Sequence, residues 1–247
     1  MSENKQQTIL IPNRETSESQ LYSPFGPLIG YKKLSDELVN ILNEGVNNHE
    51  KGSETLEDHS DYLVGKIQEE LTFSEHHVAA TMRELIPFIK EYLVASKSRE
   101  LMVPATLGKD TDINVAVDGA WFVRSFAGDF NPIHTHTDCL LSCIGYLNIP
   151  EELEKEWEND SGFPCVGLTQ FVFGAPTDSF YAPCHFFIKP KVGDFYLFPA
   201  SLQHMVYPFK SKGERRSFSM NFIFNLIDKK NKVLTKPQKV LGEYGEV

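Results

Sequence analysis

Histidine and aspartate alternate with other residues in the segment Asn-Pro-Ile-His-Thr-His-Thr-Asp, residues 131–138. Side chains at alternate positions of an extended strand point to the same face, so His134, His136 and Asp138 are predicted to share one face. Two imidazoles and a carboxylate are costly to crowd together unless a cation lies among them. Because imidazole and carboxylate ligands suit iron, zinc and manganese, the segment predicts part of a metal site.

A further ligand has to come from another part of the chain. His204, in Leu-Gln-His-Met-Val-Tyr-Pro, is the best candidate. Strand geometry alone does not choose between His134 and His136 as the second imidazole ligand. His185 is a weaker candidate, because a single histidine on a strand is more often a core residue than a ligand.

A strand near residue 217 combines a polar face with an apolar one. The polar face carries Arg215, Ser217, Ser219 and Asn221, and the other face carries Phe218, Met220, Phe222 and Phe224. A polar face is buried at acceptable cost only if it meets polar partners, so it indicates a polar ligand. Alternation favours Arg215 over Arg216 as the inward-facing arginine, because Arg216 falls on the phenylalanine face.

The totals limit the class of protein. The 247 residues suffice for one domain whose core needs no metal or disulfide to fold. The net charge of −10 argues against a nucleic-acid partner. The sequence has no apolar run long enough to span a membrane and no signal peptide at its start, and its four cysteines lack a metal-binding spacing. We expect a cytoplasmic protein that does not associate with membranes.

The pattern of elements changes along the chain. Residues 1–105 are predicted to form a helical support region, with helices beginning at Ser35 and ending near Gly45, beginning near Asp61, and beginning at Ser74. In residues 106–228 apolar and polar residues alternate with a period of two, which predicts a core of β-strands, with Gly119 separating its first two strands. Residues 229–247 read as a polar tail. One domain of α+β class, mainly β, is therefore expected: a jelly roll (double-stranded β-helix) buttressed by N-terminal helices.

These residues also resemble a known family. His136-Thr137-Asp138, the strand ending Ile144-Gly145-Tyr146-Leu147-Asn148, His204 and the run Arg215-Arg216-Ser217-Phe218-Ser219 occur in the order found in Fe(II)/2-oxoglutarate-dependent dioxygenases. The similarity covers roughly residues 121–224, and the prolyl-4-hydroxylase-like branch is the most similar. The sequence departs from that branch at Gly145, where an aromatic residue is common.

The resemblance implies a site and a reaction. His136, Asp138 and His204 would bind Fe(II), and His134 would lie beside them. Arg215 and Ser217, with Tyr146, would hold 2-oxoglutarate, and O2 would complete the reaction, with ascorbate as an optional addition. The expected reaction is hydroxylation of a protein side chain, such as a prolyl residue, or of a small molecule.

Two other functions fit part of the pattern. A cupin-like metal-binding protein without oxygenase activity would use His134, His136 and His204. A metallohydrolase would use the metal but would not need the Arg–Ser strand. The sequence does not identify the substrate or the oligomeric state.

Overall fold

The computed structural model describes residues 19–22, 26–58, 60, 65–101, 107–159, 165–174, 184–228 and 233–235. The helices in this part of the chain are α1 (Asp36–Glu50), α2 (Glu75–Leu101) and α3 (Glu151–Asn159). None of these helices is long and apolar enough to cross a membrane.

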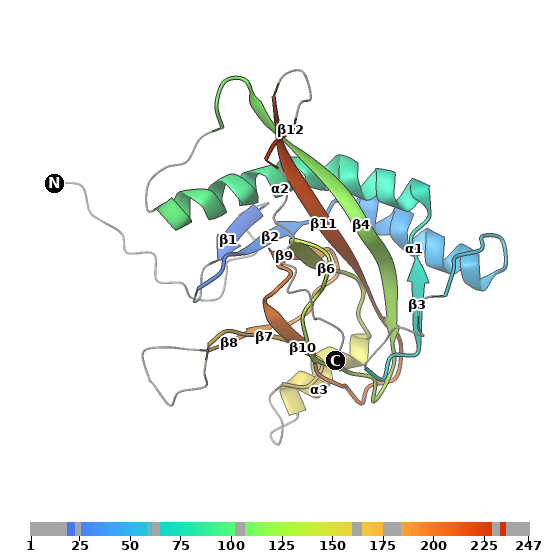
Figure 1. The fold of residues 1–247 in the computed structure, drawn as a ribbon. Coiled ribbons are helices and arrows are strands. Elements are labelled where there is room, and N and C mark those ends of the chain that lie inside the picture. Colours follow the sequence, from blue (N-terminus) through green and yellow to red (C-terminus); the bar gives the residue numbers. More distant parts are fainter. Residues whose placement is uncertain are drawn as a thin grey trace, which may run out of the picture.

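The strands form two antiparallel sheets (Figure 1). The larger sheet runs in the order β1 (Ser19–Tyr22), β2 (Ile29–Lys33), β9 (Asp194–Pro199), β6 (Leu141–Asn148), β11 (Arg215–Asp228), β4 (Thr111–Ser125) and β3 (Glu69–Thr72), and β12 (Val233–Thr235) pairs with β11. The smaller sheet runs in the order β5 (Asn131–His134), β10 (Gln203–Val206), β7 (Thr169–Val172) and β8 (His185–Ile188).

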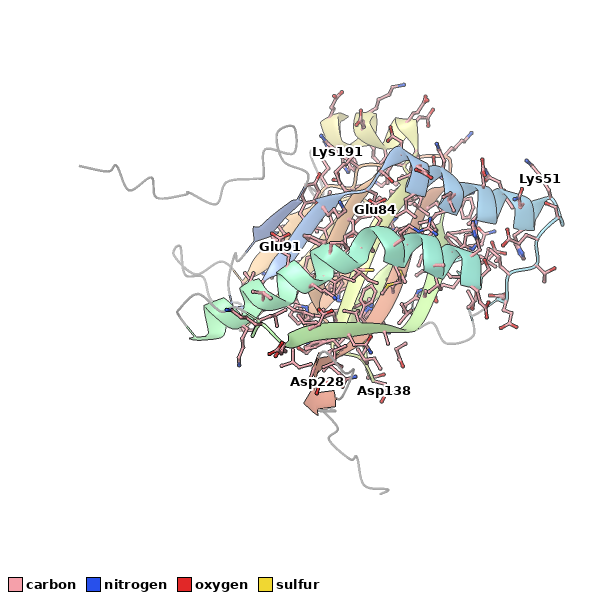
Figure 2. All side chains as sticks on the ribbon, turned by 90° about the horizontal axis from the view of Figure 1, so that it is seen from above. Lys51, Glu84, Glu91, Asp138, Lys191 and Asp228 are labelled. Carbon is pink, nitrogen blue, oxygen red and sulfur yellow. The ribbon has the colours of Figure 1, made fainter. Side chains whose placement is uncertain are left out.

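The helices α1 and α2 cover one face of the larger sheet, as Figure 2 shows from above. Leu42 and Ile89 from the helices are fully buried in one apolar cluster with Phe122, Phe218 and Phe222 from the sheet. Burial of large apolar side chains of this kind contributes roughly 1.5–3 kcal/mol each. This packing stabilises the larger sheet through one face, so the opposite face can carry polar side chains.

A second apolar cluster lies between the two sheets. It joins Tyr146, Tyr196 and Phe198 of the larger sheet to Phe171 and Ile188 of the smaller one. The two sheets therefore pack face to face and do not close into a barrel. The prediction of a mainly β, jelly-roll fold braced by N-terminal helices is confirmed.

The helix predicted at Ser35 is present. The Ser35 hydroxyl oxygen accepts a hydrogen bond of 3.2 Å from the Leu38 backbone N–H, which caps α1. The predicted end at Gly45 is wrong, because α1 continues to Glu50. A Cβ at Gly45 would lie 2.2 Å from Nε2 of His77, so this glycine allows close packing against α2.

The helix predicted near Asp61 is wrong where the structure describes it. Residues 61–64 lie outside the described residues, and Glu69–Thr72 form the strand β3, paired with β4. Leu71 lies opposite Phe122 in the core beneath the helices, whereas Glu70 lies opposite Val123 on the other face. The backbone hydrogen bonds of an edge strand thus override a weak helical pattern.

The third predicted helix corresponds to α2, which contains Pro87 without ending there. Gly119 does not separate two strands, because β4 is continuous from Thr111 to Ser125. Asn221 pairs with Gly119 and Phe222 with Val117, so Asp118 is an extra residue at a bulge. Of the predicted polar tail, residues 229–232 and 236–247 lie outside the described residues.

Candidate active site

A cavity of about 570 Å³ lies between the two sheets. The polar face of β11 lines it with Arg215, Ser217, Ser219 and Asn221, as strand alternation predicts. The smaller sheet and the loop after β5 contribute the imidazoles of His134, His136 and His204. The cavity thus brings together residues that lie far apart in the sequence.

The three histidines form one group. His204 of β10 lies opposite His134 of β5 in the ladder between these strands. The backbone N–H of His136 donates a hydrogen bond of 3.0 Å to the Ala200 carbonyl, which holds the loop after β5 beside β10. Nε2 of His136 lies 3.3 Å from Nε2 of His204, and one nitrogen of each of the three rings lies within 4.8 Å of the others. That spacing is suited to a shared cation.

Contacts between Nδ1 and backbone carbonyls fix the orientation of two of these imidazoles. Nδ1 of His134 lies 2.7 Å from the Pro132 carbonyl, and Nδ1 of His204 lies 2.9 Å from the Leu202 carbonyl. A carbonyl oxygen can only accept, so Nδ1 donates and Nε2 is left with its lone pair free for a metal.

Burial also keeps the three rings uncharged. It lowers the pKa of His204 to about 3 and that of His136 to about 4, with the neighbouring histidines adding to both shifts. Burial lowers the pKa of His134 as well. Because metals bind the neutral imidazole, the cluster is in the ligating state at neutral pH. Three imidazoles facing an open cavity fit a divalent ion such as Fe(II).

Asp138 is not a member of this group, contrary to the predicted ligand set. The strand β5 ends at His134, and Asp138 has a φ of 61°, in the left-handed region. The backbone therefore does not continue the alternation that would align Asp138 with His136. Asp138 is exposed and lies at the edge of the molecule (Figure 2). His134, which the family resemblance left beside the site, occupies the third position.

Arg215 is buried with few partners. It is 4% exposed and lines the cavity, and its guanidinium donates long hydrogen bonds to the Gly167 carbonyl, 3.3 Å, and the Ser125 hydroxyl, 3.4 Å. Burial lowers the pKa of Arg215, and the electrostatic interactions with Tyr146 and Asp129 only partly offset this. A guanidinium that remains charged in such a place fits an anionic ligand, above all a carboxylate.

The two other residues expected near the co-substrate differ in position. Ser217 is buried and lines the cavity beside Arg215. Tyr146 lies opposite Ser217 in the β6–β11 ladder, but it is fully buried in the cluster between the sheets. Its hydroxyl lies 2.7 Å from the Thr169 hydroxyl. A role for Tyr146 in ligand binding stays a prediction.

Arg216 points to the opposite side, as strand alternation predicts. Its guanidinium pairs with Glu214 at 2.8 Å and donates to the Asn47 side chain of α1 at 2.9 Å. Burial raises the pKa of Glu214, but the hydrogen bonds from Arg216 and Arg124 outweigh it and lower the pKa overall. Arg216 therefore ties β11 to α1 and has no free donor fork for a ligand.

Gly145 does not face the cavity either. It pairs with Phe218 on the face of the sheet that the helices cover. A Cβ at this position would lie 2.1 Å from the Phe218 ring. The departure from the resembling branch at this position thus reflects packing of the core.

The sequence did not predict the positions of Trp121 and Glu70 in the cavity. Trp121 of β4 faces the cavity, with its ring centroid 6.0 Å from that of His136. The alternation of β4, in which Trp121 and Val123 share a face, could have revealed it. Glu70 of β3 also lines the cavity. The sequence predicts a helix for this segment, so strand alternation could not assign Glu70 to a face.

Comparison with known proteins agrees with this geometry. Residues 119–221 match the model of a family described as "Putative 2OG-Fe(II) oxygenase". No curated protein matches the chain. A non-heme alpha-ketoglutarate-dependent carbocyclase of nogalamycin biosynthesis has a similar structure, with a TM-score of 0.50 and 10% identity, covering 81% of each chain.

Prolyl hydroxylases are also among the similar structures. The prolyl-4-hydroxylase of Pseudomonas putida has a TM-score of 0.46 and 17% identity, covering 78% of this chain and 91% of its own. The viral collagen prolyl hydroxylase of Paramecium Bursaria Chlorella virus-1, solved with 2OG, has a TM-score of 0.45 and 16% identity, covering 84% and 96%. The match across residues 119–221 confirms the resemblance to the Fe(II)/2-oxoglutarate-dependent oxygenases noted in the sequence.

Proposed function

We propose that this oxygenase hydroxylates a C–H bond of its substrate, with Fe(II) bound by His134, His136 and His204 and 2-oxoglutarate anchored by Arg215. One observation carries the proposal: the histidine cluster and the buried arginine line the same cavity. An iron ligand set and a carboxylate site are the two parts that a 2-oxoglutarate oxygenase needs. His136 and His204 belong to both the predicted ligand set and this one; His134 takes the place of Asp138.

The residues of the cavity divide between metal binding, binding of 2-oxoglutarate and exclusion of water. His134 and His204 would offer Nε2 lone pairs and His136 a ring nitrogen, and the cavity beside them has room for further ligands. Arg215 would grip the distal carboxylate of 2-oxoglutarate, with the Ser217 hydroxyl as a further donor. Trp121, Val206 and Phe198 give the cavity apolar walls that limit the access of water. Iron, 2-oxoglutarate and O2 together supply the oxidising power for hydroxylation.

A second function also has an observation in its favour. The three-histidine group is the ligand set expected of a cupin-like metal-binding protein without oxygenase activity. Such a protein has no need of a buried arginine beside the metal, and burying a charged guanidinium is costly. Arg215 therefore favours the oxygenase, and formation of succinate from 2-oxoglutarate distinguishes the two functions.

The substrate stays open between a protein side chain, including a prolyl residue, and a small molecule. A cytoplasmic location is part of the proposal. The four cysteines, all described, are free thiols, which suits a reducing compartment.

The test of this proposal is the stability of the protein with 2-oxoglutarate in the presence and absence of metal. The arginine and the metal would bind opposite ends of one ligand, so 2-oxoglutarate is expected to stabilise the protein only when a divalent metal is present. At a concentration about one hundred times its dissociation constant, the gain should be roughly 2.7 kcal/mol.

Thermal unfolding of the full chain, with Mn(II) in place of Fe(II) to avoid oxidation, measures this gain. Succinate serves as the control ligand, because it carries two carboxylates but lacks the keto group that chelates. A stabilisation by 2-oxoglutarate that persists in excess chelator would contradict the proposal.

A further inference from the structure

Glu70 is a buried carboxylate inside the cavity that the proposed mechanism does not use. It is 5% exposed, and it lies on the cavity face of β3, opposite Val123 of β4. None of the salt bridges between described residues involves Glu70. Buried carboxylates are normally paired with a cation, and among the described residues Glu70 has none, so a cationic ligand in the cavity could supply that partner.

The rest of the lining points to the same kind of partner. Asp118, at the bulge of β4, adds a second carboxylate at the exposed side of the cavity. The buried side-chain oxygen of Asn221 has no hydrogen-bond partner among the described residues. Arg215 is the one lysine or arginine in the described lining, and a carboxylate of 2-oxoglutarate would neutralise it. What remains is a cavity rich in acceptors and negative charge.

Trp121 connects this charge to the histidine cluster. Its side chain hydrogen-bonds to Glu70, and its ring lies 6.0 Å from that of His136. A guanidinium or ammonium group in the cavity could pair with the Glu70 carboxylate and lie over the indole of Trp121, so that an ion pair and cation–π attraction act together. Because the Trp121 ring lies 6.0 Å from that of His136, a cation held against Trp121 would bring a neighbouring carbon of the substrate close to the proposed iron site.

We propose that the substrate carries a cationic group, a guanidinium or a protonated amine, which binds in the cavity against Glu70 and Trp121. This inference rests on the proposed function in one respect, that the cation belongs to the molecule that is hydroxylated. Glu70 would thus be a specificity-determining residue.

Small probes test the site without knowledge of the full substrate. Butylguanidinium and butylammonium carry the cation, and butylurea is a neutral analogue of the first. Calorimetric titration into the full chain, with Mn(II) and 2-oxoglutarate and without O2, should show binding of both cations and weaker binding of butylurea. Glu70→Gln should weaken the cations ten- to hundredfold, the loss of one charge-assisted contact.

Glu69 provides the matched control. It is the adjacent residue on the opposite face of β3, where it pairs with Arg124 at 2.6 Å. Glu69→Gln therefore removes the same charge from the same strand but not from the cavity, and it should leave the affinity for both cations unchanged.

Three results would overturn the inference: equal cation affinity in Glu70→Gln and the wild type, equal affinity for butylurea and butylguanidinium, or no binding of either cation at millimolar concentration. Titration of 2-oxoglutarate into the same samples separates this inference from the proposed function. A wild-type protein that binds 2-oxoglutarate but neither cation refutes the inference alone. Cation binding that depends on Glu70 in a protein that does not bind 2-oxoglutarate upholds the cation site and refutes the proposed function.

Discussion

His134 lies directly opposite His204 across the β5–β10 ladder, and their ring centroids are 4.2 Å apart. This pairing brings His134 into the candidate metal site, while Asp138 lies beyond the end of the strand. Three neutral imidazoles leave the full double charge on a divalent metal, whereas an aspartate would cancel part of it. A site with three imidazoles should therefore attract a dianion such as 2-oxoglutarate more strongly than a site with two imidazoles and an aspartate.

The third ligand is tested by two substitutions. His134→Ala removes a lone pair from the cluster and should lower the affinity for Mn(II) or Fe(II) by about ten- to a hundredfold. Asp138→Asn should leave it unchanged, because Asp138 is exposed and outside the group. Calorimetric titration of metal into each variant measures both effects. Strong loss in Asp138→Asn with retention in His134→Ala would restore the ligand set predicted from the sequence.

The two adjacent arginines are expected to separate ligand binding from stability. Arg215→Ala should weaken 2-oxoglutarate about ten- to a hundredfold, because one charge-assisted contact of roughly 1.5–3 kcal/mol is lost. Arg215→Lys should recover only part of the affinity, since an ammonium lacks the planar fork. The measurement is the dissociation constant for 2-oxoglutarate with Mn(II) bound.

Arg216→Ala is the comparison for that experiment. It breaks the contacts to Glu214 and Asn47 and should lower the free energy of unfolding by about 1–3 kcal/mol while leaving the affinity for 2-oxoglutarate intact. If Arg216→Ala binds 2-oxoglutarate more weakly than Arg215→Ala, the assignment of the two arginines is reversed.

Gly145 is predicted to matter for packing alone. Gly145→Ala places a methyl group against Phe218 and should destabilise the protein by about 1–3 kcal/mol in denaturant unfolding. Phe218→Leu introduced with it should recover part of that loss, because the smaller side chain vacates the space. A change in 2-oxoglutarate affinity in Gly145→Ala without loss of stability would contradict this reading.

Glu70 should impose a pH dependence on stability. Burial raises its pKa to about 7, the hydrogen bond from Trp121 lowers it, and Asp58 adds to the rise; Asp118 and the neutral His134 and His136 line the same cavity. Because the folded-state pKa lies above the ordinary value of 4.5, the stabilisation is fully present below about pH 4.5. It is lost as the pH rises through about 7.

Glu70→Gln cannot ionise and should not show this loss. Relative to the wild type, the variant should gain about 1–3 kcal/mol of unfolding free energy between about pH 5 and about pH 8. Urea unfolding of the metal-free proteins at both pH values gives the difference, in which the other titrating groups cancel. A difference that does not change with pH would show that Glu70 ionises as easily in the folded protein as in the unfolded chain.

Strand alternation predicted the position of β11 residues well. A period of two placed Arg215 and Ser217 in the cavity and Arg216 on the other side, because the strand is long and its two faces differ in chemistry. The helices that begin after Ser35 and Ser74 were predictable for the same local reason: a residue type that favours capping, followed by an apolar stripe.

Long-range pairing was not predictable in this way. The end of β5 at His134 depends on its pairing with β10. Likewise, β3 is a strand because β4 offers it an edge, and only that pairing brings Glu70 into the cavity. The sequence therefore indicated the chemistry of the site, whereas the proposal of His134 in place of Asp138 rests on the tertiary structure.

The most direct measurement of the central claim is the visible absorption of the Fe(II)-loaded protein during titration with 2-oxoglutarate in the absence of O2. Chelation of iron by the keto acid produces a charge-transfer band, so the band reports on both ligands at once. We predict that it appears in the wild type and in Asp138→Asn and is absent in His136→Ala. A wild-type protein that binds both Fe(II) and 2-oxoglutarate but develops no band would contradict the account.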